Sequence, residues 1–151
     1  MNMIEPAVKA DFEEVLEVWE ASVRGSHGFL KESDILFYRK KIREEYLAAV
    51  DLYVVRRGGR IVAFIGLSCD MIEMLFVHPD AQRSGLGTFL MNFAVVRKGL
   101  RRVDVNEQNT GAVDFYLRMG FVVVGCDATD SAGRPFPVLH LKKDMGMAEN
   151  V

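Results

Sequence analysis

The sequence lacks the features that mark several classes of protein. It holds only two cysteines, Cys69 and Cys126, which are too few and too far apart for a disulfide scaffold or a CxxC site. No run of about 18 or more apolar residues occurs, which argues against a membrane span, and the first residues lack the basic and apolar stretches of a secretory signal. These absences predict a cytoplasmic protein with no membrane partner.

A strong charge of either sign is also missing. The 19 Lys and Arg residues against 21 Asp and Glu residues leave a formal charge of -2, so no global positive field favours nucleic acid as a partner. The three histidines show none of the paired short spacings of a zinc or iron site, so no metal is predicted. A length of 151 residues with 50% hydrophobic content suits one ordinary domain, which we expect to span residues 1–151.

Hydrophobic periodicity predicts a succession of strands and helices. Asp11 and Ser33 are the expected caps of the first two helices, and residues 57–59 form a glycine-bearing hairpin turn. The order βααβββαβαββ indicates the α+β class with a mixed sheet, and the tail from Asp144 onward is expected to fray. The expected strands are 1–8, 52–56, 60–68, 71–77, 101–106, 121–129 and 136–143, and the expected helices are 12–23, 35–46, 85–99 and 109–119.

The most informative segment follows the strand at 71–77, where a glycine-punctuated turn leads into a helix. Unpaired N–H groups at a helix start attract phosphate, and Gly85 and Gly87 allow it to approach the backbone. Arg83 could add a charge-assisted contact. On its own the pattern fits a simple turn and helix start equally well. A P-loop is excluded because Gly87 is followed by Thr88 and not by lysine, and the three glycines of a dinucleotide-binding fold are absent.

Two separate blocks resemble the GNAT superfamily of N-acetyltransferases. Residues 82–87 match its Q/R-x-x-G-x-G/A signature and lie between the expected fourth strand and third helix, as in that family. Residues 109–121 match its N-x-x-A-x-x-F-Y-x-x-x-G-F block. The segments SVRGSHGFL and VNEQN are similar to small bacterial acetyltransferases of the YjaB type. The resemblance implies a GNAT-like mixed, mostly antiparallel sheet with splayed central strands.

The resemblance also implies acetyl-CoA as cosubstrate. Its pantetheine arm would pair with main-chain groups of the strand at 71–77, and its pyrophosphate would meet the amides of residues 83–88. A backbone N–H near Val77 would stabilise the developing oxyanion. The residues expected to bind the cosubstrate are Leu75, Phe76, Val77, Gln82, Arg83, Ser84, Gly85, Leu86, Gly87, Thr88, Asn109 and Tyr116.

By the same resemblance the enzyme would transfer acetyl directly to an amine in a ternary complex, with Tyr116 protonating the departing thiolate. A tyrosine beside Phe115 could instead be a packing residue. Glu73 is either a water-linked general base or an exposed strand carboxylate. His27 is either a group for proton transfer or a loop or capping histidine.

The remaining candidates have plainer interpretations. His78 is expected to be a turn residue, and His140 could face either the substrate groove or the helices. Cys126 is expected to be a buried small hydrophobe, with acetyl-cysteine chemistry the less favoured route.

The acceptor is the part that the sequence leaves open. In the family the acceptor groove is built by segments that correspond to residues 22–46 and 128–140, and Asp127 and Asp130 beside it would favour a cationic amine. A small molecule, an amino acid and a peptide or protein amine all remain candidates. The resemblance also leaves open a homodimer. The alternative function is a non-catalytic acetyl-CoA-binding sensor or regulatory module, which would share every cofactor feature.

Overall fold

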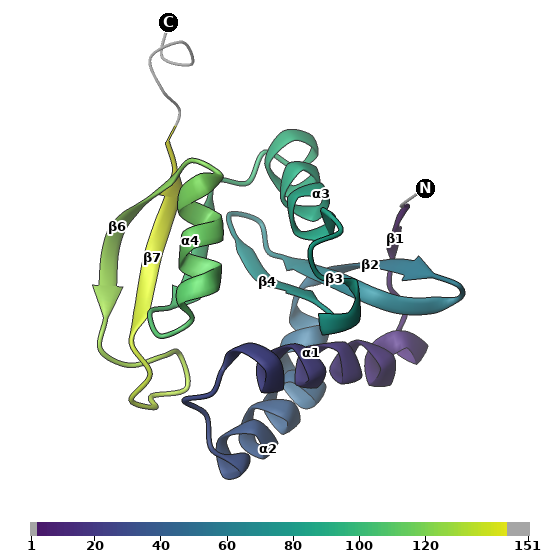
Figure 1. The fold of residues 1–151 in the computed structure, drawn as a ribbon, viewed down its shortest axis with the longest axis horizontal. Helices are drawn as coiled ribbons and strands as arrows, with labels where there is room; N and C mark the ends of the chain where they lie inside the picture. Colours follow the sequence, from purple (N-terminus) through teal and green to yellow (C-terminus); the bar gives the residue numbers. More distant parts are fainter. Residues whose placement is uncertain (1–2, 145–151) are drawn as a thin grey trace, which may run out of the picture. The chain divides into compact units, whose positions relative to one another are not determined.

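The computed structural model describes residues 3–144 and divides the chain into two compact units, Met1–Leu100 and Arg101–Val151. The single domain expected from the sequence stays a prediction, and the tail beyond Asp144 lies outside the described residues. The order of helices and strands is the expected one (Figure 1). It comprises β1 (Ile4–Pro6), α1 (Phe12–Ser26), α2 (Glu32–Lys41), β2 (Asp51–Arg57), β3 (Arg60–Leu67), β4 (Ile72–Val77), α3 (Leu86–Asn92), β5 (Arg102–Asn106), α4 (Thr110–Arg118), β6 (Phe121–Asp127) and β7 (Val138–Lys143).

The first unit contains an antiparallel sheet in the order β1-β2-β3-β4. Strands β2 and β3 are joined by the two residues Gly58 and Gly59, whose φ angles are 59° and 79°. Two successive residues with positive φ match the twist of the flanking strands, and glycine adopts this backbone without steric cost. The antiparallel pairing of β2 with β3, which begins the meander β2-β3-β4, is therefore set by a turn that the sequence predicts.

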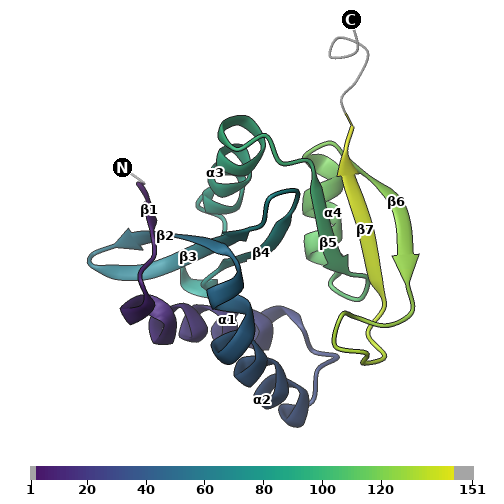
Figure 2. The same cartoon turned by 180° about the vertical axis from the view of Figure 1, so that it is seen from behind.

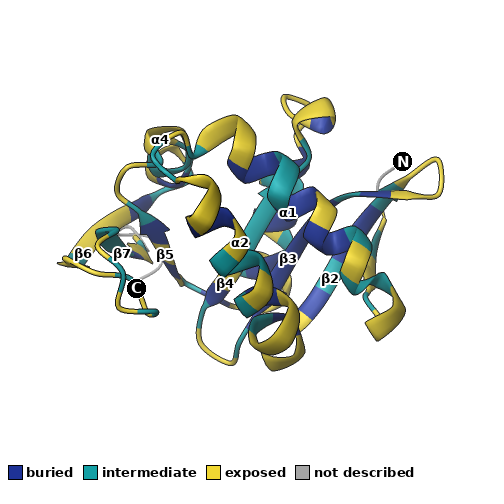
Figure 3. Cartoon of the chain, turned by 90° about the horizontal axis from the view of Figure 1, so that it is seen from below, coloured by how far each residue is buried: buried dark blue, intermediate teal, exposed yellow. Residues whose placement is uncertain are grey.

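Helices cover both faces of this sheet. Helices α1 and α2 lie on one face and α3 on the other, as the two opposite views show (Figures 1 and 2). The face toward α1 contributes Val54 and Phe64, which are fully buried, and α1 contributes Leu16 and Trp19. Figure 3 shows the buried colour along β2 and β3 and its alternation with exposed residues along α1. Burial on both faces explains why the middle of β2, residues 52–55, and nearly all of β3 are continuously apolar.

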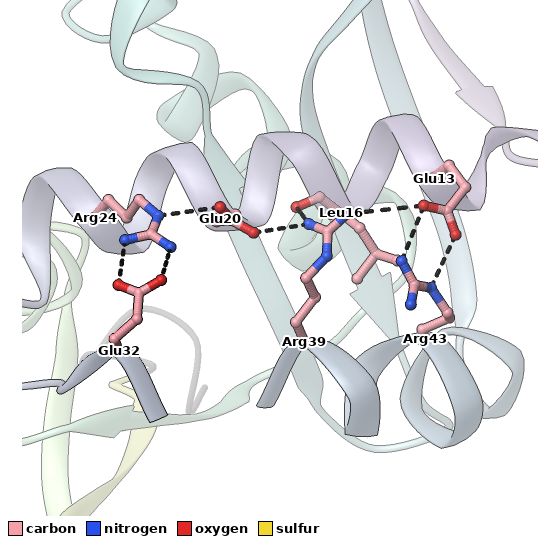
Figure 4. A network of polar contacts seen from close by, with 7 residues as sticks. All are labelled: Glu13, Leu16, Glu20, Arg24, Glu32, Arg39 and Arg43. Carbon is pink, nitrogen blue, oxygen red and sulfur yellow. Dashed lines mark hydrogen bonds and ion pairs between the residues drawn. The ribbon is translucent and has the colours of Figure 1, made fainter. Parts of the chain in front are cut away.

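A chain of ion pairs joins α1 to α2 and to the π-helical segment η2 (Ile42–Tyr46) that continues it (Figure 4). Arg39 contacts both Glu20, at 3.0 Å, and Glu13, at 3.7 Å. Arg43 bonds Glu13 at 2.8 Å. Arg24 bonds Glu20 at 3.0 Å and forms a bidentate pair with Glu32, the first residue of α2. Each arginine therefore ties α1 to the second helix by charge-assisted hydrogen bonds.

The helix starts differ from the sequence expectation. Helix α2 begins before Ser33, which was the expected cap; the carboxylate of Asp34 accepts the N–H of Lys31 at 2.9 Å instead. Asp11 immediately precedes α1 but makes no side-chain cap bond to it. Its carboxylate accepts the N–H of Val8 at 2.9 Å, and that bond together with Arg56 lowers the pKa of Asp11. Asp and Ser are common at helix starts, but their position alone does not reveal which N–H they accept.

The second unit contains an antiparallel sheet in the order β5-β7-β6, with α4 against one face. The row facing α4 includes Val103, Phe121 and Leu141, each at most 2% exposed. The ladder between β6 and β7 shifts register between Val123 and Gly125, which leaves Val124 as the extra residue of a bulge. The Nζ of Lys143 donates to the carbonyl of Met119, so a cation caps the C-terminal end of α4.

Candidate functional site

The loop after β4 starts with a short 3-10 turn, η4 (Pro79–Ala81). Nδ1 of His78 accepts the N–H of Asp80 at 3.1 Å, so His78 is the turn residue that the sequence predicts. Nε2 of Gln82 donates weakly to the carbonyl of Val77, at 3.4 Å. The loop is therefore folded back on the end of β4 before it turns into α3.

Left-handed backbone at two positions directs the chain into α3. Arg83 has a φ of 63° and Gly85, the N-cap residue of α3, has a φ of 81°. Ser84 braces the turn because its hydroxyl donates to the carbonyl of Ala81. A non-glycine residue with positive φ costs about 1–2 kcal/mol, and such strain gathers at functional sites. The exposed side chain of Arg83 has no polar partner within residues 3–144.

Six consecutive N–H groups, those of residues 83–88, find no acceptor in the described part of the chain. The first helical bond runs from the N–H of Phe89 to the carbonyl of Gly85 at 2.9 Å, which leaves the preceding donors unpaired. A Cβ built at Gly85 would meet nothing within 4 Å, so the space beside these donors is open. Unpaired N–H groups with a free arginine among them form a site for an anion of phosphate type.

The backbone of β4 offers a second set of polar groups. The N–H of His78 donates to the carbonyl of Val62 at 2.8 Å, which marks a hydrogen-bonded pair between β3 and β4. Because such pairs alternate along an antiparallel ladder, the main-chain groups of Phe76 bond to β3. Those of Leu75 and Val77 point away from β3. Of the three residues expected to pair with pantetheine, Leu75 and Val77 therefore have main-chain groups that β3 does not use, whereas Phe76 does not.

Tyr116 lies on α4 and is buried, with 6% of its surface exposed. Its ring makes edge contacts with Phe115 and Phe121, at centroid distances of 5.3 and 5.8 Å. The hydroxyl has no hydrogen-bond partner within residues 3–144, yet it is not among their fully buried unpaired polar atoms, so it keeps contact with solvent. Burial raises the pKa of Tyr116, so the hydroxyl carries its proton at neutral pH and can act as a donor.

Asn109 is the N-cap residue of α4. Its Oδ1 accepts the N–H of Ala112 at 3.3 Å, which is the usual bond of a capping asparagine. The motif residue that was expected to contact the cosubstrate therefore also starts the helix that carries Tyr116.

Glu73 is exposed on β4 and accepts a hydrogen bond from the hydroxyl of Ser68 at 3.0 Å. The register between β3 and β4 shifts here, because Met74 pairs with Gly66 but Ile72 pairs with Leu67. Glu73 is the extra residue of this bulge. Regular alternation along the strand would place Glu73 on the same face as Leu75, and the bulge removes the basis for that inference.

His27 ends α1 and is half-buried. Its Nδ1 lies 2.7 Å from the hydroxyl of Ser26, and its ring lies 5.2 Å from that of Phe29. Burial lowers the pKa of His27 to about 4, so the imidazole is neutral at physiological pH. An imidazole with so low a pKa is a weak acceptor for the proton of an ammonium group.

The remaining sequence candidates fall on unit 2. His140 lies on the face of the sheet that points away from α4, because it pairs with Asp104, whereas the buried Leu141 belongs to the face that packs against α4. Cys126 is exposed, so the expectation of a buried cysteine is wrong: β6 is the outer strand of its sheet and α4 does not cover this residue. Asp127 bonds His140, and Asp130 accepts the N–H groups of its own hairpin loop.

Sequence reasoning missed three features of these sites. They are the left-handed Arg83, the hydrogen bond from Ser68 to Glu73 and the two carboxylates around His140. No sequence pattern indicates a positive φ at an arginine. The other two features depend on strand register, which the sequence does not determine.

Two findings concern the predictions that the protein binds no metal and has no membrane partner. Among residues 3–144, no group of three or more His, Cys, Asp or Glu side chains is arranged to hold a metal ion. None of the helices in that part of the chain combines the length and apolar character that a membrane span requires. The cytoplasmic setting stays a prediction.

Comparison with known proteins gives matches that extend over both units. A family profile described as an acetyltransferase (GNAT) domain matches residues 48–123. The peptidyl-lysine N-acetyltransferase YjaB of Salmonella typhimurium is 35% identical over 133 residues, which cover 85% of this chain and 89% of that protein.

Two solved structures resemble the fold. The solution structure of apo YjaB from Escherichia coli has a TM-score of 0.86 and 31% identity, covering 94% of this chain and 97% of that one. A PaiA N-acetyltransferase from Thermoplasma acidophilum, solved in complex with coenzyme A, has a TM-score of 0.75 and 18% identity, covering 95% of this chain and 99% of that one. The second likeness concerns the fold alone.

Proposed function

Because this chain belongs to the GNAT family of acetyltransferases, which use acetyl-CoA, we propose that it transfers the acetyl group directly to the side-chain amine of a lysine in a peptide or protein. The expected family, fold class, enzyme class and cosubstrate are confirmed. The choice of acceptor rests on the YjaB relative, which is named as a peptidyl-lysine N-acetyltransferase. An amino acid or another small amine is the competing acceptor.

The observation that carries the proposal is the run of unpaired N–H groups at residues 83–88. The pyrophosphate of acetyl-CoA is a dianionic group of the kind that such donors bind, and Arg83 adds a positive charge beside it. The open space at Gly85 lets phosphate oxygens come close to the backbone.

The pantetheine arm carries two amides, which need main-chain partners of the kind that a strand supplies. We assign this role to Leu75 and Val77, because the main-chain groups of Phe76 already bond to β3. The side chain of Gln82 then has to release the carbonyl of Val77, which its weak 3.4 Å bond permits.

In the reaction the neutral amine attacks the thioester carbonyl, the C–S bond breaks and the amine loses a proton while the thiolate gains one. We propose that the hydroxyl of Tyr116 donates its hydrogen to the departing sulfur. The raised pKa of Tyr116 makes this a hydrogen bond that stabilises the thiolate, and net protonation of the thiolate is completed by the proton that the attacking nitrogen loses as the amide forms.

A lysine amine is mostly protonated at neutral pH, so a base is needed before the attack. Glu73 is the better of the two candidates. Its carboxylate is exposed and oriented by Ser68, whereas the ring of His27 is half-buried and already contacts Ser26 and Phe29. Asp127 and Asp130, which were expected to attract a cationic amine, already accept hydrogen bonds within unit 2.

The test combines binding with turnover. Acetyl-CoA is titrated by calorimetry into the wild type, Tyr116→Phe and, as a matched control, Tyr53→Phe, in which a tyrosine packed against Phe93 loses its hydroxyl. Release of free thiol is then followed with lysine peptides, free lysine and small amines. We expect one-to-one binding by all three proteins and a loss of peptide-dependent thiol release in Tyr116→Phe only.

The alternatives give different results. Binding without turnover on any acceptor would support the sensor function. Turnover with free amines but not with peptides would overturn the assigned acceptor while leaving the transferase intact.

A further inference from the structure

His140 lies between two carboxylates that come from different strands. Its Nδ1 is 2.7 Å from Oδ1 of Asp104 on β5, and its Nε2 is 2.7 Å from Oδ2 of Asp127 on β6. His140 itself belongs to β7, the middle strand of this sheet. One side chain therefore links all three strands of unit 2, and the acetyl transfer described above uses none of these residues.

Both contacts can be hydrogen bonds only if the imidazole is protonated. A neutral imidazole has one N–H, so one of its nitrogens would present a lone pair to a carboxylate oxygen at 2.7 Å. The imidazolium donates from both nitrogens, and 2.7 Å is the length of a charge-assisted bond. Asp104 and, next, Asp127 raise the pKa of His140. The geometry and the shift agree on a charged ring.

The link lies just beyond the bulge that interrupts the pairing of β6 with β7. The bulge at Val124 interrupts the ladder to β7, and the segment 125–127 beyond it has no buried side chain. The first part of β6 is held differently, since Phe121 is only 2% exposed in the row that faces α4. Asp127 is thus the side chain that ties the outer part of β6 to its neighbours.

We propose that Asp104, His140 and Asp127 form a pH-sensitive clamp that holds residues 125–127, and with them the hairpin loop 128–137, against β7 and β5. While the ring is charged both bonds exist and the segment is held. When the ring loses its proton one bond is lost, and a lone pair then faces a carboxylate. The outer part of β6 then opens locally while the rest of the chain stays folded.

The sign of the pH dependence follows from the raised pKa. The clamp is at full strength below about pH 6.5, the ordinary value for histidine, and it weakens as the pH rises through the pKa of His140 in the folded chain. The other charged groups of this sheet face are Arg102 on β5 and its partner Lys142 on β7, which both disfavour a charged ring. The loop adds Asp130 and Arg134, which balance each other, and α4 packs on the opposite face.

The test follows His140 in the full chain by NMR over roughly pH 6 to 9, where histidine is the side chain that normally titrates. We expect its midpoint above the ordinary value, and a downward shift of about half a unit or more in Asp104→Asn and in Asp127→Asn. Both substitutions keep the shape of the side chain, so folding is retained. Amide exchange, corrected for the intrinsic pH effect, should show protection at 125–127 falling about tenfold across the midpoint.

Two comparisons make the result decisive. In His140→Gln the protection at 125–127 should be low and independent of pH, while amides of β2 and β3 behave as in the wild type. Since no cosubstrate is used, the outcome is separate from the proposed transferase activity. A wild-type midpoint at or below the ordinary histidine value, or protection at 125–127 that ignores the titration of His140, would overturn the clamp.

Discussion

The proposed phosphate site at residues 83–88 can be tested by adding a single methyl group, as a glycine-to-alanine substitution, inside the site and at a matched position outside it. Gly85 and Gly99 have φ angles of 81° and 70°, and a Cβ built on either would meet nothing within 4 Å. Gly85→Ala and Gly99→Ala should therefore each cost only the left-handed penalty, about 1–2 kcal/mol. For a chain of this size that lowers Tm by roughly 2–8 °C, equally in both variants.

The two variants should differ in affinity for acetyl-CoA. A methyl group at position 85 would occupy the open space at the start of α3, where we expect it to hinder the approach of phosphate oxygens to the unpaired N–H groups of residues 83–88. A hydrogen bond to a charged group contributes about 1.5–3 kcal/mol, so losing one raises Kd by roughly 10- to 100-fold. Calorimetry should show this for Gly85→Ala and an unchanged Kd for Gly99→Ala. Equal Kd values in the two variants would refute the assignment of this loop to the pyrophosphate.

Three further results are expected. Tyr116→Phe removes the hydrogen bond to the departing sulfur, and a bond to a charged group contributes about 1.5–3 kcal/mol, so kcat should fall about 10- to 100-fold in the thiol-release assay. Because both ring contacts are kept, Tm should stay within roughly 2 °C of the wild-type value. Because His27 has a folded pKa of about 4, below its ordinary value, only the unfolded chain binds its proton between these pH values. Stability in urea should therefore fall by about 1–3 kcal/mol from pH 6.5 to 4, and less in His27→Gln. Glu20→Gln should cost under about 1 kcal/mol at low salt and less at high salt, since its ion pairs with Arg24 and Arg39 are partly exposed.

The loop at residues 83–88, which we propose binds phosphate, could be predicted from the sequence because its signal is contiguous. Glycine spacing after an apolar strand defines both the helix start and its unpaired donors, and the structure places both as expected. The strain at Arg83 could not be read, because many residue types precede a glycine-capped helix without positive φ. The same holds for Ser33: a serine near a helix start was taken as the cap, but Asp34 accepts the relevant N–H.

Statements that depended on strand register were less secure. One hydrogen-bonded pair, His78 with Val62, determines which residues of β4 have their main-chain groups bonded to β3. The sequence does not show which residues of the strand these are. They include Phe76, whose main-chain groups bond to β3, but not Leu75 and Val77, whose groups point away from it. The exposure of Cys126 similarly follows from its place on an outer strand, which an apolar stretch does not reveal.

The two bulges show how a single extra residue changes which side chains meet. Strict alternation from Phe121, which faces α4, would place Asp127 on that same face. The extra residue Val124 shifts the remainder of β6 by one, and Asp127 reaches the face of His140. Deletion of Val124 removes the extra residue and leaves a regular ladder in which Asp127 stays on the face of His140, so the NMR titration midpoint of His140 should keep its wild-type value. Val124→Ala keeps the bulge and should leave the midpoint unchanged. A folded deletion variant whose midpoint falls as far as that of Asp127→Asn would show that this account of the strand faces is wrong.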